Sequence, residues 1–282
     1  MTATLTPTTE PAPTSSSVRH GSLFSESIVF ARRRVEHIRQ LPEKLLDVTL
    51  QPLMFVLLFT YVFGGAIGVE DGSYREYLIG GILIQTLAFG LVGPAMSIAT
   101  DLTEGVVDRF RSLPVRRTSY LVGHWIAELS GMALATVLIL TAGFIVGWRT
   151  HAGPVDLATA AVLILAFAAA MVWVGTYVGL LVRTPDAVMG VAFTTIFPLT
   201  FISNAFVPIA SLPNFLQWVA SVNPVSVIVA AVRTLFGNPV TPNPKDVWPL
   251  DHPVPAAFLY TAVLLVLAIA ASIRRYRQRT TG

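Results

Sequence analysis

Six long apolar runs constrain the fold of this chain more than any other feature of its sequence. They cover approximately residues 47–67, 77–100, 119–148, 157–182, 187–209 and 254–273. A helix that crosses the hydrocarbon core of a bilayer needs about 20 mostly apolar residues, and each run is about that long or longer. The sequence therefore predicts an all-α polytopic membrane protein whose transmembrane domain, residues 47–273, contains six transmembrane helices.

The composition supports a bilayer as the solvent of this chain. Only 12% of its residues are charged, 54% are apolar and the mean hydropathy is +0.67, whereas soluble domains carry about 25% charged residues. The chain has no cysteine, which excludes disulfides and thiolate metal sites. Its basic pI of 9.4 does not indicate a nucleic-acid partner, because the basic residues lie between apolar runs and not on one face of a soluble fold.

The distribution of basic residues predicts the orientation. An even number of spans places both termini on one side of the membrane. Fifteen of the 19 basic residues fall on that side, and only Arg75, Arg149, Arg233 and Lys245 fall on the other. By the positive-inside rule, we predict a multi-pass protein of the cell (plasma) membrane with both termini cytoplasmic.

Three segments flank the spans on the predicted cytoplasmic side. Residues 1–22 are rich in Thr, Pro and Ser and predict a disordered tail, while residues 274–282 form a basic tail. Residues 23–46 place apolar side chains at steps of three and four, which predicts an amphipathic elbow helix in the inner headgroup region. Its polar face includes Arg32, Arg33, Glu36 and Arg39. The alternative is a simple electrostatic anchor.

A charged island at residues 101–117 separates the second and third apolar runs. Asp101 or Thr103 can cap the start of a helix, and Phe110 and Leu113 continue an apolar stripe. The island therefore predicts a short cytoplasmic amphipathic helix. Its mixed charges and apolar stripe favour docking into a groove on another protein; the alternative is a solvated linker whose arginines only set the orientation.

Two short apolar helices are predicted within residues 211–237, between the fifth and sixth spans. Ser211 is a candidate N-cap, Asn223-Pro224 is expected to end the first helix and Gly237 the second. Each helix is too short to cross a bilayer, so both are expected to be re-entrant or to lie on the outer surface. The proline-rich residues 238–253 predict an irregular outer loop.

Motifs for nucleotide binding and for catalysis are missing from the sequence. The ATP-binding pattern GxxxxGK[ST] cannot occur because neither Lys44 nor Lys245 follows a glycine. We expect no catalytic residues, because GxSxG, HExxH and cysteine-based patterns are lacking, and no metal site. His124 and Glu128 lie one turn apart in the third span. A helix-packing pair is the favoured interpretation, and a proton relay is the alternative.

Two segments carry a resemblance to a known family: TEGVVDRFRSLPVRRTSYLVG (103–123) and VPIASLPNFLQWVASVNPVSVIVAAVRTLFGNP (207–239). Both resemble segments of the ABC type-2 permease family, in particular its daunorubicin-resistance branch. The first is similar to the family's cytoplasmic coupling helix, and the second to its paired short outer helices. The order of elements over residues 23–277 resembles that of the family as well.

The resemblance implies that the chain is the membrane half of an exporter. Two permease copies would join two copies of a separate ATPase subunit, which would bind ATP and magnesium, so no cofactor is expected in this chain. We expect a homodimer, with a pair of related permeases as the alternative. The positions expected to face the ATPase subunit are Glu104, Gly105, Asp108, Arg109, Phe110, Arg111, Leu113 and Pro114.

The predicted spans indicate a hydrophobic cargo. The family handles lipophilic drugs, lipids and sugar polymers, and mainly apolar and aromatic faces favour a drug, an antibiotic or a lipid. The candidate path consists of Gln51, Phe55, Phe59, Gln85, Phe197, Phe201 and Asn204. Ordinary packing or lipid contact is the alternative role of these phenylalanines. An ion-coupled transporter or channel without an ATPase partner, and a membrane enzyme, are the alternative functions.

Overall fold

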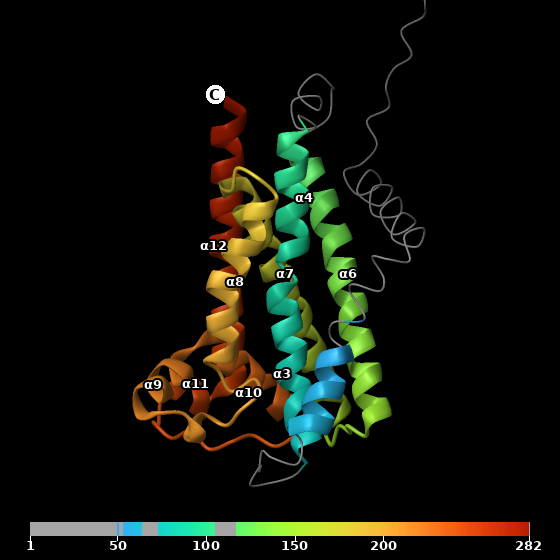
Figure 1. Ribbon diagram of the computed structural model, residues 1–282, viewed down its shortest axis with the longest axis vertical. Coiled ribbons are helices and arrows are strands. Elements are labelled where there is room, and N and C mark those ends of the chain that lie inside the picture. Colours follow the sequence, from blue (N-terminus) through green and yellow to red (C-terminus); the bar gives the residue numbers. More distant parts are fainter. Residues whose placement is uncertain (1–49, 51–52, 64–72, 105–116, 282) are drawn as a thin grey trace, which may run out of the picture.

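The described part of the chain is a bundle of long apolar helices. The computed structural model describes residue 50 and residues 53–63, 73–104 and 117–281 (Figure 1). Within these ranges the structure is helical and contains no strand. Four helices are long and apolar enough to cross a membrane: Tyr74–Thr103, Gly123–Val146, Pro154–Leu181 and Pro253–Gln278. The prediction of an all-α polytopic membrane protein is confirmed.

The remaining two predicted spans are shorter in the described residues. An apolar helix covers Leu53–Val62 and ends in the π-helical turn η1 (Phe59–Phe63), and α8 covers Asp186–Phe201. Sixteen helical residues extend about 24 Å, less than the hydrocarbon core of about 30 Å. A continuous fifth span over residues 187–209 is therefore wrong, because the chain leaves the helix after Phe201. The total of six spans stays a prediction.

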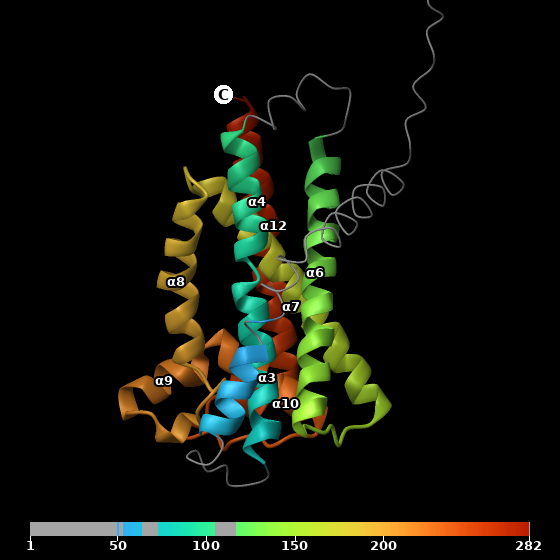
Figure 2. The same ribbon diagram turned by 45° about the vertical axis from the view of Figure 1, so that its right-hand side comes forward.

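The second predicted span is present as two consecutive helices, α3 (Tyr74–Phe89) and α4 (Val92–Thr103). Pro94 accounts for the interruption at Gly90, because proline lacks an N–H group and its ring collides with the carbonyl four residues earlier. Most of α3 is inaccessible to solvent. It is the central helix of the bundle, and its neighbours are visible in Figures 1 and 2.

Helix α7 (Pro154–Leu181) packs against α4 on one side and against α12 (Pro253–Thr281) on the other. Its contact with α4 depends on Gly175 and Gly179, because a Cβ atom at either position would overlap a backbone carbonyl of α4 or of the residue before it. Small residues at such a contact let two membrane helices approach closely. On the other side, the hydroxyl of Ser272 in α12 donates a hydrogen bond to the carbonyl oxygen of Trp173 (3.1 Å).

Helix α6 (Arg117–Val146) lies at the edge of the bundle (Figure 2). Only 22% of its most apolar stretch is buried, and the side chains of Val137, Phe144 and Ile145 are exposed. The indole nitrogen of Trp125 donates a hydrogen bond to Ala169 O of α7 at 3.4 Å. The exposed apolar side chains give α6 a surface suited to contact with lipid.

The two short helices before the last span are α9 (Asn214–Val222) and α10 (Pro224–Phe236), which meet at 69°. Asn223 ends α9 and caps α10, since its side-chain oxygen accepts a hydrogen bond from the backbone N–H of Val225 (2.9 Å). Gly237 ends α10 with a left-handed φ of 65°. The predicted helix boundaries at Asn223 and Gly237 are confirmed.

Two boundary predictions in the same region are wrong. Ser211 does not cap α9: it belongs to the 3-10 turn η2 (Ile209–Ser211), and its hydroxyl bonds to the carbonyl of Pro208, while Pro213 is the N-cap residue. The loop 238–253 is not irregular throughout, because it contains one helical turn, α11 (Trp248–Asp251).

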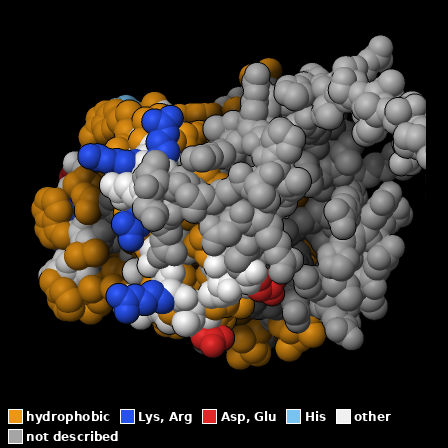
Figure 3. Space-filling view, turned by 90° about the horizontal axis from the view of Figure 1, so that it is seen from above, with side chains coloured by type: hydrophobic (Ala, Val, Ile, Leu, Met, Phe, Trp, Pro, Cys, Tyr) orange, Lys and Arg blue, Asp and Glu red, His pale blue; other side chains and the backbone are white. Residues whose placement is uncertain are grey.

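The bundle has two distinct ends. We call the end with α9 and α10 the hairpin end, and the opposite one, where α12 finishes, the C-terminal end (Figure 1). Figure 3 looks onto the C-terminal end and shows basic side chains beside apolar ones. The arginines that follow the apolar part of α12 are Arg274, Arg275, Arg277 and Arg279.

The charged island begins at the C-terminal end, but its first residues do not start a new helix. Asp101 and Thr103 lie in the last turn of α4, and Glu104 is its C-cap. The prediction that Asp101 or Thr103 caps a separate helix is therefore wrong. The remainder of the island from Gly105 to Arg116, the elbow helix, the N-terminal tail and Gln51 lie outside the described residues.

Candidate functional site

Seven phenylalanine rings form a continuous row along one side of the bundle, which we call the phenylalanine row. Neighbouring ring centroids lie 4.2 to 6.2 Å apart. This range is typical of favourable aromatic pairs. In spatial order the rings are Phe55, Phe59, Phe206, Phe201, Phe197, Phe193 and Phe89.

Helix α8 supplies the exposed part of this row. Phe193, Phe197 and Phe201 recur every four residues and are 52%, 42% and 41% exposed. The buried stripe of the same helix consists of Val188, Ala192, Ile196 and Thr200. Helix α8 is thus held through one narrow stripe of small and aliphatic side chains and presents phenyl rings to its surroundings.

The structure brings four of the predicted path residues together: Phe55, Phe59, Phe197 and Phe201. The link between the two pairs is Phe206, whose ring contacts both Phe59 and Phe201. Sequence reasoning missed Phe206 because it follows Phe201 by five residues and breaks the four-residue spacing. Phe193 continues that spacing and could have been found.

Gln85 lies on the side of α3 that faces α8. One turn before it, a Cβ atom at Gly81 would overlap the backbone of Ala205, and one turn after it, the ring of Phe89 contacts Phe193. Residues four apart share a face of a helix. Gln85 is 6% exposed, so its amide is buried on the side of α3 that faces α8.

The chain between α8 and η2 is not helical, and we call residues 202–208 the unwound segment. Exposed polar backbone is costly in lipid, so a non-helical segment at membrane depth has to be buried in protein and hydrogen-bonded. Side chains of other elements supply these bonds. The amide nitrogen of Asn223 donates to the carbonyls of Leu199 (2.7 Å) and Ile202 (2.6 Å).

Two tyrosines and an arginine bind the three consecutive carbonyls of residues 204–206. The hydroxyl of Tyr77 donates to Asn204 O (2.7 Å), and that of Tyr74 donates to Phe206 O (3.2 Å). Between them, Nη2 of Arg233 donates to Ala205 O (3.0 Å). We call this set of side chains the Arg233 clasp; its members are Tyr74, Tyr77, Asn223 and Arg233.

Arg233 is the central member of the clasp and is completely buried. Its Nε donates to the carbonyl oxygen of Tyr77 at 2.8 Å, and its guanidinium carbon lies 3.4 Å from the centre of the Tyr77 ring. No acidic side chain of the described residues pairs with it. A buried charge at membrane depth is costly and usually has a function.

Arg233 is one of the four basic residues predicted on the outer side of the membrane, and the structure adds that its side chain is buried at the hairpin end. The signal that could have found it is its spacing in α10. It follows Val229 by four residues and Ala230 by three, so it shares a face of the helix with these two buried apolar residues. Asn204, a predicted path residue, also lies at the clasp and is buried.

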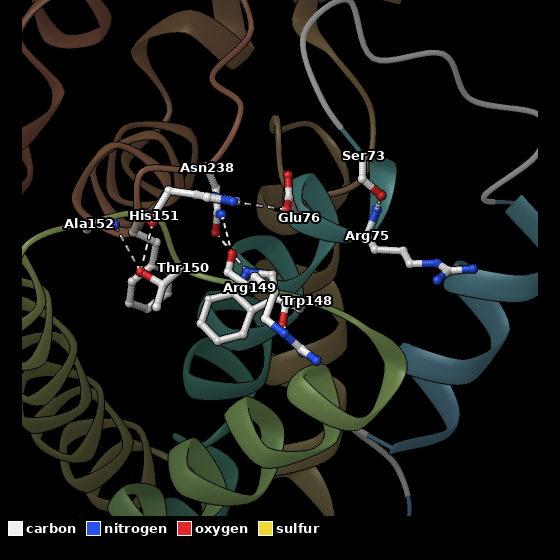
Figure 4. A network of polar contacts seen from close by, with 10 residues as sticks. Ser73, Arg75, Glu76, Trp148, Arg149, Thr150, His151, Ala152 and Asn238 are labelled. Carbon is white, nitrogen blue, oxygen red and sulfur yellow. Dashed lines mark hydrogen bonds and ion pairs between the residues drawn. The ribbon is translucent and has the colours of Figure 1, made fainter.

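A polar network holds the hairpin end together (Figure 4). The loop between α6 and α7 is fastened to the end of α10, because the indole of Trp148 donates to the Asn238 side chain (2.7 Å), whose nitrogen donates to Arg149 O (2.8 Å). His151 N donates to Phe236 O (3.0 Å), and its imidazole lies 4.0 Å from a carboxylate oxygen of Glu76 in α3. The loop between α6 and α7 is therefore connected to both α10 and α3 at this end.

His124 and Glu128 lie on the side of α6 that faces α4. His124 is 7% exposed, and a carboxylate oxygen of Glu128 would be 3.1 Å from a Cβ atom at Gly93. Packing against a glycine is the arrangement that the helix-packing interpretation predicts. Within the described residues, no group of three or more His, Cys, Asp or Glu side chains could hold a metal ion.

Comparisons with known proteins agree with this architecture. Residues 27–236 match the family model of the ABC-2 type transporter. The chain is 29% identical over 212 residues to the daunorubicin resistance ABC transporter permease protein DrrB1 of Streptomyces coeruleorubidus, covering 75% of each chain. It is 26% identical over 220 residues to the doxorubicin resistance ABC transporter permease protein DrrB of Mycobacterium tuberculosis, covering 78% of this chain and 75% of the other.

A further relative is a transport permease from another organism. The putative transport permease ycf38 of Pyropia yezoensis is 26% identical over 226 residues, which cover 77% of this chain and 76% of the relative. The family model spans the described helices from the first apolar helix to the end of α10 and thus includes the Arg233 clasp. The chain belongs to the ABC-2 type transporter family, in the branch of the daunorubicin and doxorubicin resistance permeases.

Proposed function

We propose that this chain is the permease subunit of an ATP-driven exporter that moves a hydrophobic drug, antibiotic or lipid out of the cell. Family membership and relatives named as drug resistance permeases support this class of function. ATP would be hydrolysed by a separate subunit, since the sequence lacks the GxxxxGK[ST] pattern.

The phenylalanine row is the observation that supports a hydrophobic cargo. Half-exposed rings on α8 provide apolar contact area for an aromatic or acyl group. A sugar polymer would have to give up hydrogen bonds to water against these rings, at a cost of about 1–3 kcal/mol for each unpaired polar group. The amide of Gln85 behind the row offers a hydrogen bond to a polar substituent of an otherwise apolar cargo.

The charged island is the proposed contact with the ATPase subunit. Helix α4 runs without a break to Thr103, so a displacement of the residues from Glu104 onward would be transmitted directly into α4. From α4 it would reach α7 through Gly175 and Gly179, and α8 through the buried contact of Val188 with Ala95 and Ala99. In this arrangement the C-terminal end is cytoplasmic and the hairpin end faces outward.

We further propose that two permease copies, most simply identical, assemble with two ATPase subunits. One permease supplies one charged island, so a pair of ATPase subunits requires a pair of permeases. The phenylalanine row would line the path in each copy.

Export by variants of the row tests this proposal. Phe197→Ala and Phe201→Ala, measured in inside-out vesicles with ATP and doxorubicin as the probe, are expected to lower the initial transport rate at least tenfold together. Phe144→Ala is the matched control, because Phe144 is equally exposed but lies on α6, away from the row. If the double variant transports as fast as this control, the row is not part of the path.

A further inference from the structure

We propose that the unwound segment, residues 202–208, is the hinge of α8, and that Arg233 is the positioning residue that fixes the hinge at the hairpin end. The N-terminal end of α8, which begins at Asp186, would swing, and the phenylalanine row would open and close with it. This inference rests on the proposed function for its purpose, but its geometry can be tested without transport.

The fixed side of the hinge is the Arg233 clasp. Four carbonyls of residues 202–206 accept hydrogen bonds from Asn223, Tyr77, Arg233 and Tyr74. The backbone N–H of Asn204 is also bound, to the hydroxyl of Ser226 in α10 at 3.2 Å. These five bonds all come from α3, α10 or the residue between α9 and α10, whereas the segment bonds back to α8 only through the Ile202 amide and the Ser203 hydroxyl. The unwound segment is therefore expected to move with α3 and α10.

The mobile side is α8 itself, which is packed much less tightly. Its buried residues form a single stripe, whereas α10 is buried around most of its circumference, Arg233 included. Pro198 lies inside α8 and removes one backbone hydrogen bond of the helix. Thr200 follows it, and its hydroxyl bonds back to the carbonyl of Ile196 (2.9 Å), a contact that often accompanies bending. These features lie in the last turn of α8, next to the unwound segment.

An arginine suits the fixed side because its planar guanidinium donates in two directions at once. Nε reaches Tyr77 O in α3 while Nη2 reaches Ala205 O in the unwound segment. Space for it comes from Gly80, where a Cβ atom would lie 3.2 Å from Cγ of Arg233. A lysine keeps the charge but has a single nitrogen and cannot bridge the two carbonyls in the same planar geometry.

Two buried polar atoms at the clasp have no hydrogen-bond partner among the described residues, namely Nη1 of Arg233 and Oδ1 of Asn204. They supply one donor and one acceptor beyond those already in use. As the segment turns, these atoms can form new bonds while others are lost. The clasp can therefore hold the segment in more than one arrangement of α8.

The expected movement follows from the length of α8. Its 16 residues extend about 24 Å from the hinge, so a rotation of about 15°, common for rigid elements in allosteric transitions, would displace its far end by about 6 Å. The displacement would be largest near Asp186, about 5 Å near Met189 and close to zero near Ala210.

Spin-label distances in the full-length chain, reconstituted in lipid nanodiscs, test the hinge. The sequence contains no cysteine, so pairs of introduced cysteines can be labelled selectively. One pair joins Met189 on α8 to Leu134 on α6, and the other joins Ala210 next to the hinge to Ile145 on the same α6; all four side chains are exposed. We expect a broad distance distribution for the first pair and a narrow one for the second. When the ATP-bound ATPase subunit is added, the first distance should shift by up to about 5 Å.

Arg233→Lys should broaden the Ala210–Ile145 distance distribution. Tyr77→Phe removes only the hydrogen bond to Asn204 O and provides a milder variant if Arg233→Lys does not fold. Tyr260→Phe on α12 makes the same chemical change outside the clasp and should leave both distributions unchanged. Equal widths for the two wild-type pairs, or an unchanged Ala210–Ile145 distribution in both clasp variants, would overturn the hinge. Unequal widths in a chain that shows no ATPase-driven transport would instead overturn the proposed function and leave the hinge standing.

Discussion

Replacing Gly81 with alanine tests how tightly α3 is packed against the unwound segment. A Cβ atom at this position would overlap the carbonyl group and Cα of Ala205, which are backbone atoms and cannot simply rotate away. The same carbonyl oxygen accepts the hydrogen bond from Nη2 of Arg233. The substitution must therefore push the two elements apart and weaken the clasp at once.

The expected loss of stability follows from these two effects. Overpacking a tight core costs about 1–3 kcal/mol, and losing a hydrogen bond to a charged group costs about 1.5–3 kcal/mol. The better helix propensity of alanine offsets about 1 kcal/mol. The free energy of unfolding should therefore fall by about 3 kcal/mol, which lowers the Tm of a chain of this size by about 6–12 °C.

Thermal unfolding in detergent can measure this shift. Gly131→Ala and Gly190→Ala are matched controls, because nothing lies within 4 Å of a Cβ atom at either position. Both controls should melt at or above the wild-type temperature, since only the propensity term applies to them. If Gly81→Ala melts with the controls, α3 does not touch Ala205 and the geometry of the clasp is wrong.

Three further predictions concern other parts of the chain. Asn238→Ala removes the side chain that bonds to both Trp148 and the backbone of Arg149. It should lower the free energy of unfolding by about 1–3 kcal/mol, measured by thermal unfolding. The comparison is Asn243→Ala, whose side chain is partly exposed. An impermeant maleimide applied to intact cells should label a cysteine at Ala210 and fail to label one at Thr184; the reverse pattern would invert the proposed orientation. Replacing Phe110 and Arg111 by alanine should abolish cargo-stimulated ATPase activity at unchanged membrane levels of the permease; unchanged stimulation together with unchanged pull-down of the ATPase subunit would place the coupling contact elsewhere.

Local sequence signals predicted the parts of the fold that local chemistry determines. Asn223-Pro224 and Gly237 mark the helix ends at the hairpin because capping and a left-handed backbone depend on the residue at that position. Long apolar runs predicted the four complete membrane helices, because hydropathy over one continuous stretch decides whether it can cross a bilayer. In each case residues close together in the sequence are sufficient to decide the outcome.

The break after α8 could not be predicted in this way. The residues from Ile202 to Val207 are mostly apolar and read as a continuation of the span. What allows them to unwind is a set of distant donors, such as the Tyr77 hydroxyl that binds Asn204 O across 127 positions of the chain. The role of Arg233 was missed for a related reason, because the carbonyls that it binds, those of Tyr77 and Ala205, lie on other elements.

The candidate path, too, was predicted only where its residues lie on one helix. The spacing of Phe197 and Phe201 on one helix identified them as a set, and the structure adds that Phe206 connects them to Phe55 and Phe59. That connection depends on how the unwound segment is held against the first apolar helix. Contacts between elements far apart in sequence carry no short-range signal.

Transport by purified protein distinguishes an ATP-driven permease from a carrier that works alone. The full-length chain is reconstituted in liposomes of defined lipid, alone and with its ATPase subunit, and doxorubicin movement is followed with ATP or with an imposed pH gradient. We expect transport only when the ATPase subunit and ATP are both present. Transport by this chain alone, driven by the pH gradient, would contradict the proposed ATP-driven export.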